Sequence, residues 1–165
     1  MAKITITEPS EFMTKLSKLE TSQKKIAGKA IFAGAKIIAD QIHSNLSTIP
    51  VEPFRYLRDG DELSSASASQ VEGLMNCFGI TSLKEDEDGY NVKCGFSEYI
   101  DTNIIPATSQ YPRGLPAPML ARAIESGSSF RKKHPFVRPA IAQTKEKAKE
   151  KMAQIIEEET QKIMD

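Results

Sequence analysis

The stretch from Ser128 to Lys151 reads SSFRKKHPFVRPAIAQTKEKAKEK, and its two prolines organise the last third of the chain. A residue that precedes proline is sterically pushed away from helical backbone angles, so His134 and Arg138 should lie on extended chain. Phe136 is the expected anchor in the core, and Pro139 suits the first turn of a helix. We therefore assign structural anchoring roles to Phe136, Arg138 and Pro139. One apolar face continues through the predicted helix: Ala140, Ile141, Ala148, Met152, Ile155, Ile156 and Ile163.

Three adjacent cations, Arg131, Lys132 and Lys133, lie just before this segment. Contacts to phosphate need only charge and reach, so the cluster is a candidate for binding nucleic acid. No aromatic residue alternates with the cations, so stacking on single-stranded bases is not indicated. The alternative is a solvated triplet, and His134 is expected to be a solvated loop residue and not a general base. The residues alone leave both interpretations of the cluster open.

The N-terminal part of the chain predicts one strand and two helices. Lys3 to Thr7 alternates apolar and polar residues and is rich in β-branched side chains, which is typical of a short strand. Ser10 is placed to cap a short helix that carries apolar residues as far as Leu19. A second helix is expected to begin near Thr21 and to extend to Leu46, before two prolines, because its apolar residues recur at helical spacing.

The middle of the chain predicts a loop, a short helix and a hairpin. The serine- and alanine-rich run Ser64 to Ser69 has low complexity and is expected to be a mobile loop. A short helix follows and ends at Gly79. The runs Ile80 to Lys84 and Tyr90 to Phe96 then predict a β-hairpin, because the acidic connection Glu85 to Gly89 ends in an Asp-Gly pair.

A long segment without regular structure is expected from Ser97 to Pro116. Loops of this length inside a compact domain are usually functional or disordered. Its apolar side chains either fold back over their own core or form an arm that docks on another subunit. The candidate interface residues of such an arm are Tyr99, Ile104, Ile105 and Tyr111. A short helix should then begin near Pro118 and end at Gly127.

The predicted order of elements is typical of an α+β domain. A small antiparallel sheet, formed by the N-terminal strand and the hairpin, should pack against long helices, and a long helix should end the chain. A chain of 165 residues is most often one domain. Residues 1–165 are therefore expected to form a single unit with a long loop or arm at about 97–116.

The sequence contains no recognisable catalytic constellation. It has no glycine-rich phosphate loop, no nucleophile elbow and no zinc-protease helix motif, so we expect no enzyme, no catalytic residue and no cofactor. Cys77 and Cys94 lack ligand spacing with the two histidines, so we expect no metal site. Glu125, near a helix end, is expected to be structural or interfacial.

Charge and hydropathy restrict the class of protein and the compartment that the sequence predicts. The 22 lysines and arginines equal the 22 aspartates and glutamates, which excludes a surface wholly committed to nucleic acid. No apolar run approaches the roughly 20 residues of a membrane-spanning helix. Met1 to Thr5 shows no hydrophobic secretory segment, so we expect a protein that is made and kept in a cytoplasm.

In the second half of the chain, the strand DGYNVKCGF is followed by LARAIESGSSFRKKHPFVRPAI and a helix rich in lysine and glutamate. This order of motifs resembles the tail-component family of long-tailed bacteriophages. Members of that family have a short helix ending in an "iE.Gts" pattern, a "PF.rPA" segment and a charged terminal helix. Many also carry a "P.dTG.L" segment, whereas Pro50 to Leu57 here has no Thr-Gly. The matching residues are Ile124, Glu125, Gly127, Ser128, Pro135, Phe136, Arg138, Pro139 and Ala140.

The resemblance implies a tail-completion, tail-terminator or neck protein without catalytic residues. Such proteins form homo-oligomeric rings, commonly hexamers, between the head connector and the tail tube, and they are assembled into the virion in the bacterial cytoplasm. The neighbouring neck, connector and tail-tube proteins would be its partners. DNA passes through the ring, so Arg131, Lys132 and Lys133 become candidates for its lumen or for a subunit interface. The alternative is a cytoplasmic nucleic-acid-binding or regulatory module that uses the same three cations.

Overall fold

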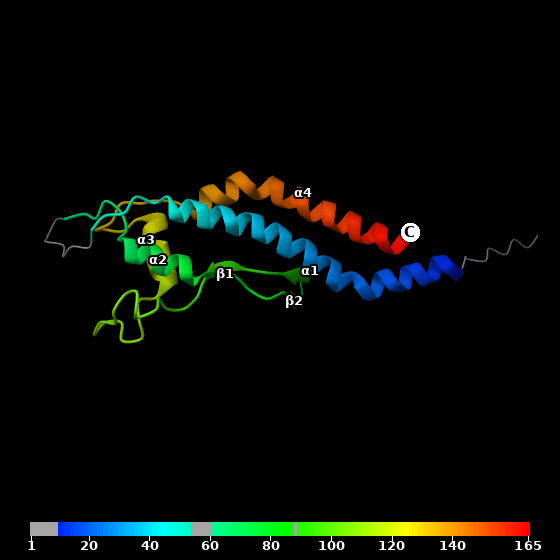
Figure 1. Ribbon diagram of the computed structural model, residues 1–165, viewed down its shortest axis with the longest axis horizontal. Helices are drawn as coiled ribbons and strands as arrows, with labels where there is room; N and C mark the ends of the chain where they lie inside the picture. Colours follow the sequence, from blue (N-terminus) through cyan, green and yellow to red (C-terminus); the bar gives the residue numbers. More distant parts are fainter. Residues whose placement is uncertain (1–9, 54–60, 88) are drawn as a thin grey trace, which may run out of the picture.

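Two long antiparallel helices, α1 (Ser10–Ser47) and α4 (Val137–Met164), dominate the protein. The computed structural model describes residues 10–53, 61–87 and 89–165. Figure 1 shows the two helices side by side along the long axis of the molecule, with the smaller elements on one side of α1. Contacts at both ends of the pair show that the helices are antiparallel, since Asn45 hydrogen-bonds to the residue before α4 and Lys15 hydrogen-bonds to the last turn of α4.

The fold is α+β, as predicted. The described residues contain four helices and two small antiparallel sheets, and the chain ends in a long helix. The predicted strand at Lys3 to Thr7 lies outside the described residues. The shorter elements are α2 (Ala68–Cys77), β1 (Phe78–Ile80), β2 (Lys84–Asp86), β3 (Gly89–Asn91), β4 (Cys94–Phe96) and α3 (Ala117–Ser126).

The predicted break between two N-terminal helices is wrong, because α1 is continuous from Ser10 to Ser47. Thr21 was expected to begin a new helix. Its hydroxyl instead donates to the carbonyl oxygens of Ser17 and Lys18 within the same helix. A threonine can satisfy its hydroxyl in this way inside a helix, so its preference for helix starts does not force an interruption.

Small residues allow α1 and α4 to approach closely. A methyl group added at Gly34 would lie 2.6 Å from the Met152 sulfur, so the α4 side chain fills the space that glycine leaves. Ala30, Ala35 and Ala39 are buried on the same helix. The small residues of α1 thus allow close packing, chiefly against α4 and to a smaller extent against β1 and β3.

The predicted hairpin is present but is interrupted by one extra residue. Ile80 pairs with Cys94 in the β1–β4 ladder, and Lys84 pairs with Asn91 in the β2–β3 ladder. Three residues separate the ladders on the first strand and two on the second, which is a β-bulge. The strand with the extra residue carries Leu83 towards α1. A methyl group added at Gly28 would lie 3.1 Å from the Leu83 side chain.

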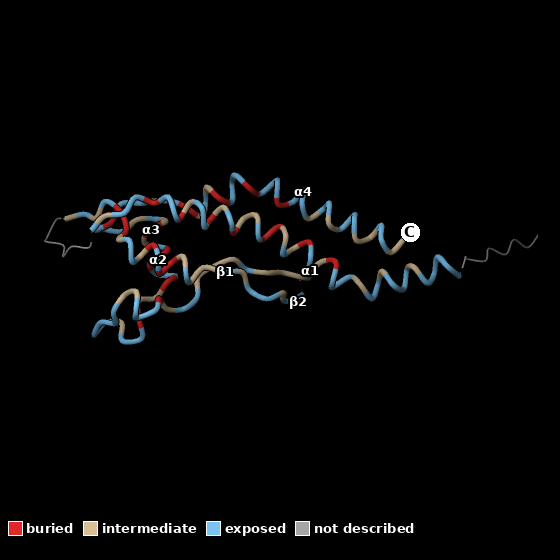
Figure 2. The backbone as a smooth tube through the Cα atoms, viewed as in Figure 1, coloured by how far each residue is buried: buried red, intermediate tan, exposed pale blue. Residues whose placement is uncertain are grey.

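The core lies at one end of the helix pair. Figure 2 shows most of the buried chain where α2, α3 and the start of α4 meet the end of α1. Phe136, the expected anchor, is 1% exposed, and its ring meets Phe96 edge-on at 6.1 Å. The largest fully buried side chains are Phe136, Leu46, Leu74, Ile100 and Ile124.

The Ser64 to Ser69 run is not a free loop. Ser65 and Ala66 are 3% and 0% exposed. The Ser67 side chain accepts from the Gln70 N–H while the Gln70 side chain accepts from the Ser67 N–H, forming a capping box at the start of α2. Low complexity therefore conceals a helix start, which the Ser-x-x-Gln spacing could have indicated.

Candidate functional site

The carboxylate of Glu125 joins the end of α3 to the start of α4. It accepts hydrogen bonds from the backbone N–H groups of Phe136, Val137 and Arg138, at 2.6, 2.9 and 3.1 Å. These N–H groups have no partner within the helix, and the positive end of the helix dipole favours a negative charge beside them. The Glu125 side chain is only 11% exposed. Its role is thus structural, one of the two roles the sequence allowed.

This cap also moves the start of α4. Pro139 was expected to begin the helix, with Arg138 on extended chain, but α4 starts at Val137 and Arg138 is helical. The carboxylate of Glu125 offsets the steric preference of a residue before proline by satisfying three N–H groups at once. The Arg138 side chain is 80% exposed, with Nε 3.8 Å from the same carboxylate.

A tight turn follows α3. Gly127 has a φ of 77°, in the left-handed region that favours glycine, and it ends the helix as predicted. The Ser128 N–H donates to the carbonyl oxygen of Arg131 at 2.9 Å, closing the turn. Phe130 lies in this turn and is 49% exposed. The turn therefore presents an aromatic side chain and directs the following chain back towards the core.

Arg131 points into the protein and not into solvent. The residue is 5% exposed, and its guanidinium donates to the Ser65 carbonyl oxygen at 2.6 Å and to the Gln70 side chain at 3.1 Å. Burial lowers the pKa of the guanidinium, and the nearby Glu52 carboxylate opposes that shift. Arg131 therefore ties the turn to the start of α2, and the three adjacent cations do not form one exposed patch.

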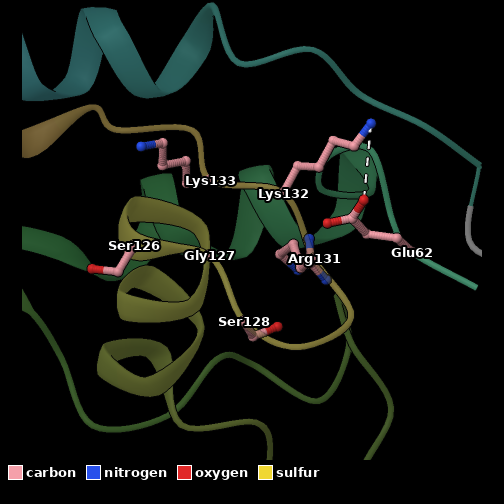
Figure 3. Close-up of a pocket in the computed structure, with 7 residues that line it drawn as sticks. All are labelled: Glu62, Ser126, Gly127, Ser128, Arg131, Lys132 and Lys133. Atoms are coloured by element: carbon pink, nitrogen blue, oxygen red, sulfur yellow. Dashed lines mark ion pairs between the residues drawn. The ribbon is translucent and has the colours of Figure 1, made fainter. Parts of the chain in front are cut away.

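The two remaining cations line an open cleft beside this turn. Figure 3 shows Lys132 and Lys133 diverging from the extended chain, with Lys132 directed towards Glu62. Lys132 Nζ lies 3.9 Å from the Glu62 carboxylate, and both side chains are largely exposed. The cleft has a volume of about 600 Å³. We call it the basic cleft, and its lining residues are Glu62, Ser126, Gly127, Ser128, Arg131, Lys132 and Lys133.

His134 belongs to the same connection. Its Nε2 lies 2.6 Å from the Ser64 carbonyl oxygen, and its backbone N–H donates to the Ile124 carbonyl oxygen at 2.7 Å. It was expected to be a solvated loop residue, but it is half-buried and bonded on both sides. His134 thus helps to hold the extended chain between the serine-rich segment and α3.

The 97–116 segment forms an arm whose base is closed. The Ile100 N–H donates to Leu115, and the Ala117 N–H donates to Glu98, so the two ends are paired. Figure 1 shows the arm extending away from α1 and α4, below α2 and α3. Ile104 and Ile105 are half-buried against the core. At these two isoleucines the loop therefore folds back over its own core, which is one of the two alternatives that the sequence left open.

The two tyrosines of the arm also have partners within the chain. The Arg113 guanidinium lies over the Tyr99 ring, 4.6 Å from its centroid. The Tyr111 hydroxyl lies 3.6 Å from the Met119 sulfur. Both rings are half-buried. By contrast, residues 106–110 are all exposed, and we call them the outer part of the arm.

The neutral chain is divided into segments of opposite charge. Residues 72–101 contain seven acidic residues and two lysines, whereas residues 113–138 contain six lysines or arginines and one acidic residue. The acidic segment includes the β2–β3 hairpin, and the basic segment includes α3 and the basic cleft. Overall neutrality therefore hides a strong charge asymmetry along the fold.

No group of three or more metal-ligating side chains is placed to hold an ion within residues 10–53, 61–87 and 89–165. Within the same ranges, the helices lack the combination of length and apolarity that crossing a bilayer requires. Comparisons of the chain with protein-family models, curated proteins and solved structures gave no match.

Proposed function

We propose that this protein is a ring-forming structural component of a tailed bacteriophage or phage-like particle. It would act in tail completion, as a tail terminator or neck component between the head connector and the tail tube. In this role it is not an enzyme, its principal partner is another copy of itself, and DNA only passes through the lumen of the ring.

The observation that carries the proposal is the pattern from Ile124 to Ala140. Its two halves work as one structural unit, since Glu125 caps the helix that the second half begins. Phe136 fills the core from the same segment. A pattern whose parts depend on one another in this way is a stronger basis for family resemblance than separate short motifs.

Two further features support self-assembly. The arm presents an exposed outer part, residues 106–110, on a base that is anchored to the core. The separation of acidic and basic segments gives each subunit two unlike surfaces, which head-to-tail rings require. A zero net charge also avoids the like-charge repulsion that would oppose association.

The direct test is the mass and shape of the purified protein. Light scattering over a wide concentration range should give a mass of several subunits, and electron microscopy should show closed rings. Mass spectrometry of purified tailed particles from the source strain should detect the chain. A monomer at every concentration that is also absent from such particles would overturn the proposal.

The arm provides a second test. Replacing residues 106–110 with a glycine-serine linker of equal length keeps Ile104 and Ile105 against the core. We expect unchanged thermal unfolding and a loss of ring formation. The matched control replaces Lys145 and Lys147 with serine on the exposed face of α4 and should assemble normally. Rings formed equally well by the linker variant would exclude the arm from the interface.

The nucleic-acid-binding alternative depends on Arg131, Lys132 and Lys133. Because the Arg131 guanidinium is engaged inside the protein, only the two lysines are placed for phosphate contacts. That alternative would be supported by tight duplex binding that weakens steeply with salt and is lost when the two lysines become alanine.

A further inference from the structure

The basic cleft and the acidic hairpin lie on different parts of the molecule. Figure 1 shows β2 beside the middle of α1, whereas the connection from α3 to α4 lies near one end of the helix pair, where α1 ends and α4 begins. A contact between these two surfaces would therefore not form within one chain. Between two chains it joins two unlike surfaces, and such contacts repeated head to tail produce rings or filaments.

The tip of the β2–β3 hairpin carries adjacent acidic side chains. Glu85, Asp86 and Glu87 are all exposed. Glu85 lies 3.0 Å from Lys24 of α1 and Asp86 accepts from Asn91, so these contacts attach β2 to its neighbours while both residues stay exposed. Residues 85–87 thus present three exposed carboxylates at the end of β2.

The basic cleft is the complementary concave surface. It is open to solvent, and its volume of about 600 Å³ leaves room for a few side chains. Lys133 is exposed, and Ser126 and Ser128 are among the residues that line the cleft. Glu62 shares the cleft, but its pair with Lys132 is an exposed one of 3.9 Å, and such pairs exchange partners at little cost.

We propose that the acidic hairpin tip of one copy docks into the basic cleft of the next copy, and that this contact sets the head-to-tail order of the ring. The inference rests on the proposed function and specifies its subunit interface. Charge complementarity at such an interface selects the register and increases the association rate. Because the charges are exposed, the contact should weaken as salt rises.

The test uses two charge variants and their combination. The tip variant carries Glu85→Gln and Glu87→Lys, and the cleft variant carries Lys132→Gln and Lys133→Glu. Glutamine at Glu85 and Lys132 avoids placing like charges beside Lys24 and Glu62. Each variant should raise the concentration needed for half-assembly at least about tenfold.

The chain carrying all four substitutions should recover assembly, because the two reversed charges attract again. Equal mixing of the tip and cleft variants should recover it as well. Lys147→Glu, on the exposed face of α4, is the matched control and should assemble like the unmodified chain. Circular dichroism of each variant confirms that the fold is retained.

The outcomes separate the two proposals. If the unmodified chain forms rings but the tip and cleft variants assemble equally well, the docking contact is wrong and the proposed function stands. If the tip and cleft variants both fail to assemble, and neither the chain with all four substitutions nor the mixture recovers assembly, the pairing of these two surfaces is also wrong. If the unmodified chain is a monomer at every concentration, the docking contact is wrong, and the proposed function fails with it when the chain is also absent from purified tailed particles.

Discussion

The two ends of the helix pair differ in how their apolar side chains are covered. At the end where α2, α3 and the arm meet, Leu74, Ile124 and Phe136 are at most 1% exposed. At the other end, Phe12, Met13 and Leu16 of α1 are 39–48% exposed, and the neighbouring Lys15 bonds to the last turn of α4. We call these the compact end and the two-helix end. The comparison shows that the two long helices alone leave apolar side chains exposed, whereas the short elements complete a buried core with them at the compact end.

The largest expected effect comes from truncating the anchor of the compact end. Phe136→Ala should lower the free energy of unfolding by about 3 to 5 kcal/mol, because it removes a fully buried ring and leaves a cavity. Denaturant unfolding followed by circular dichroism measures this. Phe130→Ala, at a ring that is 49% exposed, is the matched control and should cost under about 0.5 kcal/mol. Equal costs at the two positions would contradict the assignment of Phe136 as anchor.

A pair of glycine substitutions compares the compact end with the contact between α1 and α4. At Gly73, an added methyl group would lie 2.5 Å from the buried, β-branched side chain of Ile100. At Gly34 it would meet the flexible end of Met152, at 2.6 Å. Gly73→Ala should therefore cost about 1 to 3 kcal/mol through overpacking. Gly34→Ala should cost less, because Met152 can move and alanine favours the helix by about 1 kcal/mol. A larger loss at Gly34 in chemical denaturation would reverse the comparison.

Removing the carboxylate that caps α4 should have a smaller effect. Glu125→Ala leaves three backbone N–H groups without their partner and should cost about 1 to 2 kcal/mol. Glu125→Gln keeps an acceptor oxygen and should recover part of the loss. Hydrogen exchange of the first turn of α4 is the specific readout, and unchanged protection there would show that the cap is dispensable.

The smallest effect is expected at the two-helix end and depends on pH. Glu159 bonds to Lys162 and to Lys29 of α1, and these contacts lower its pKa from the ordinary 4.5 to about 2. The unfolded chain therefore takes up this proton first as the pH falls. The stabilisation is fully present above about pH 4.5 and is lost as the pH falls towards about 2.

The readout is the melting temperature at pH 6 and pH 3. Glu159→Gln should reduce the difference between the two values, and Glu146→Gln, at an exposed pair within α4, is the matched control. Because the ion pairs at Glu159 lie at the surface, high salt should reduce the effect. A pH profile that Glu159→Gln leaves unchanged would show that this link between α1 and α4 does not contribute to stability.

Most of the helices and the hairpin could be predicted from local patterns. The apolar repeat marks the buried faces of α1 and α4, and the Asp-Gly pair marks the hairpin turn. Gly127 ends α3 because its φ of 77° is readily adopted only by glycine. The continuity of α1 was missed because Thr21 bonds within the helix in place of capping a new one.

The candidate site was less predictable. The three cations are adjacent in sequence, yet Arg131 is buried and Lys132 and Lys133 line the cleft. Ser65 and Gln70, the hydrogen-bond partners of Arg131, lie more than sixty residues away in the sequence, so no local pattern could indicate them. The capping role of Glu125 also depends on the chain returning to it eleven residues later.

The sequence by itself determined the helical faces, the hairpin, the helix stop at Gly127 and the burial expected of Phe136. These features follow from steric limits and side-chain spacing, which act over a few residues. Only the tertiary structure decided the continuity of α1, the cap by Glu125 and the inward direction of Arg131. Each of these depends on which hydrogen-bond partner is nearest after folding, and that choice is made between segments that are distant along the chain.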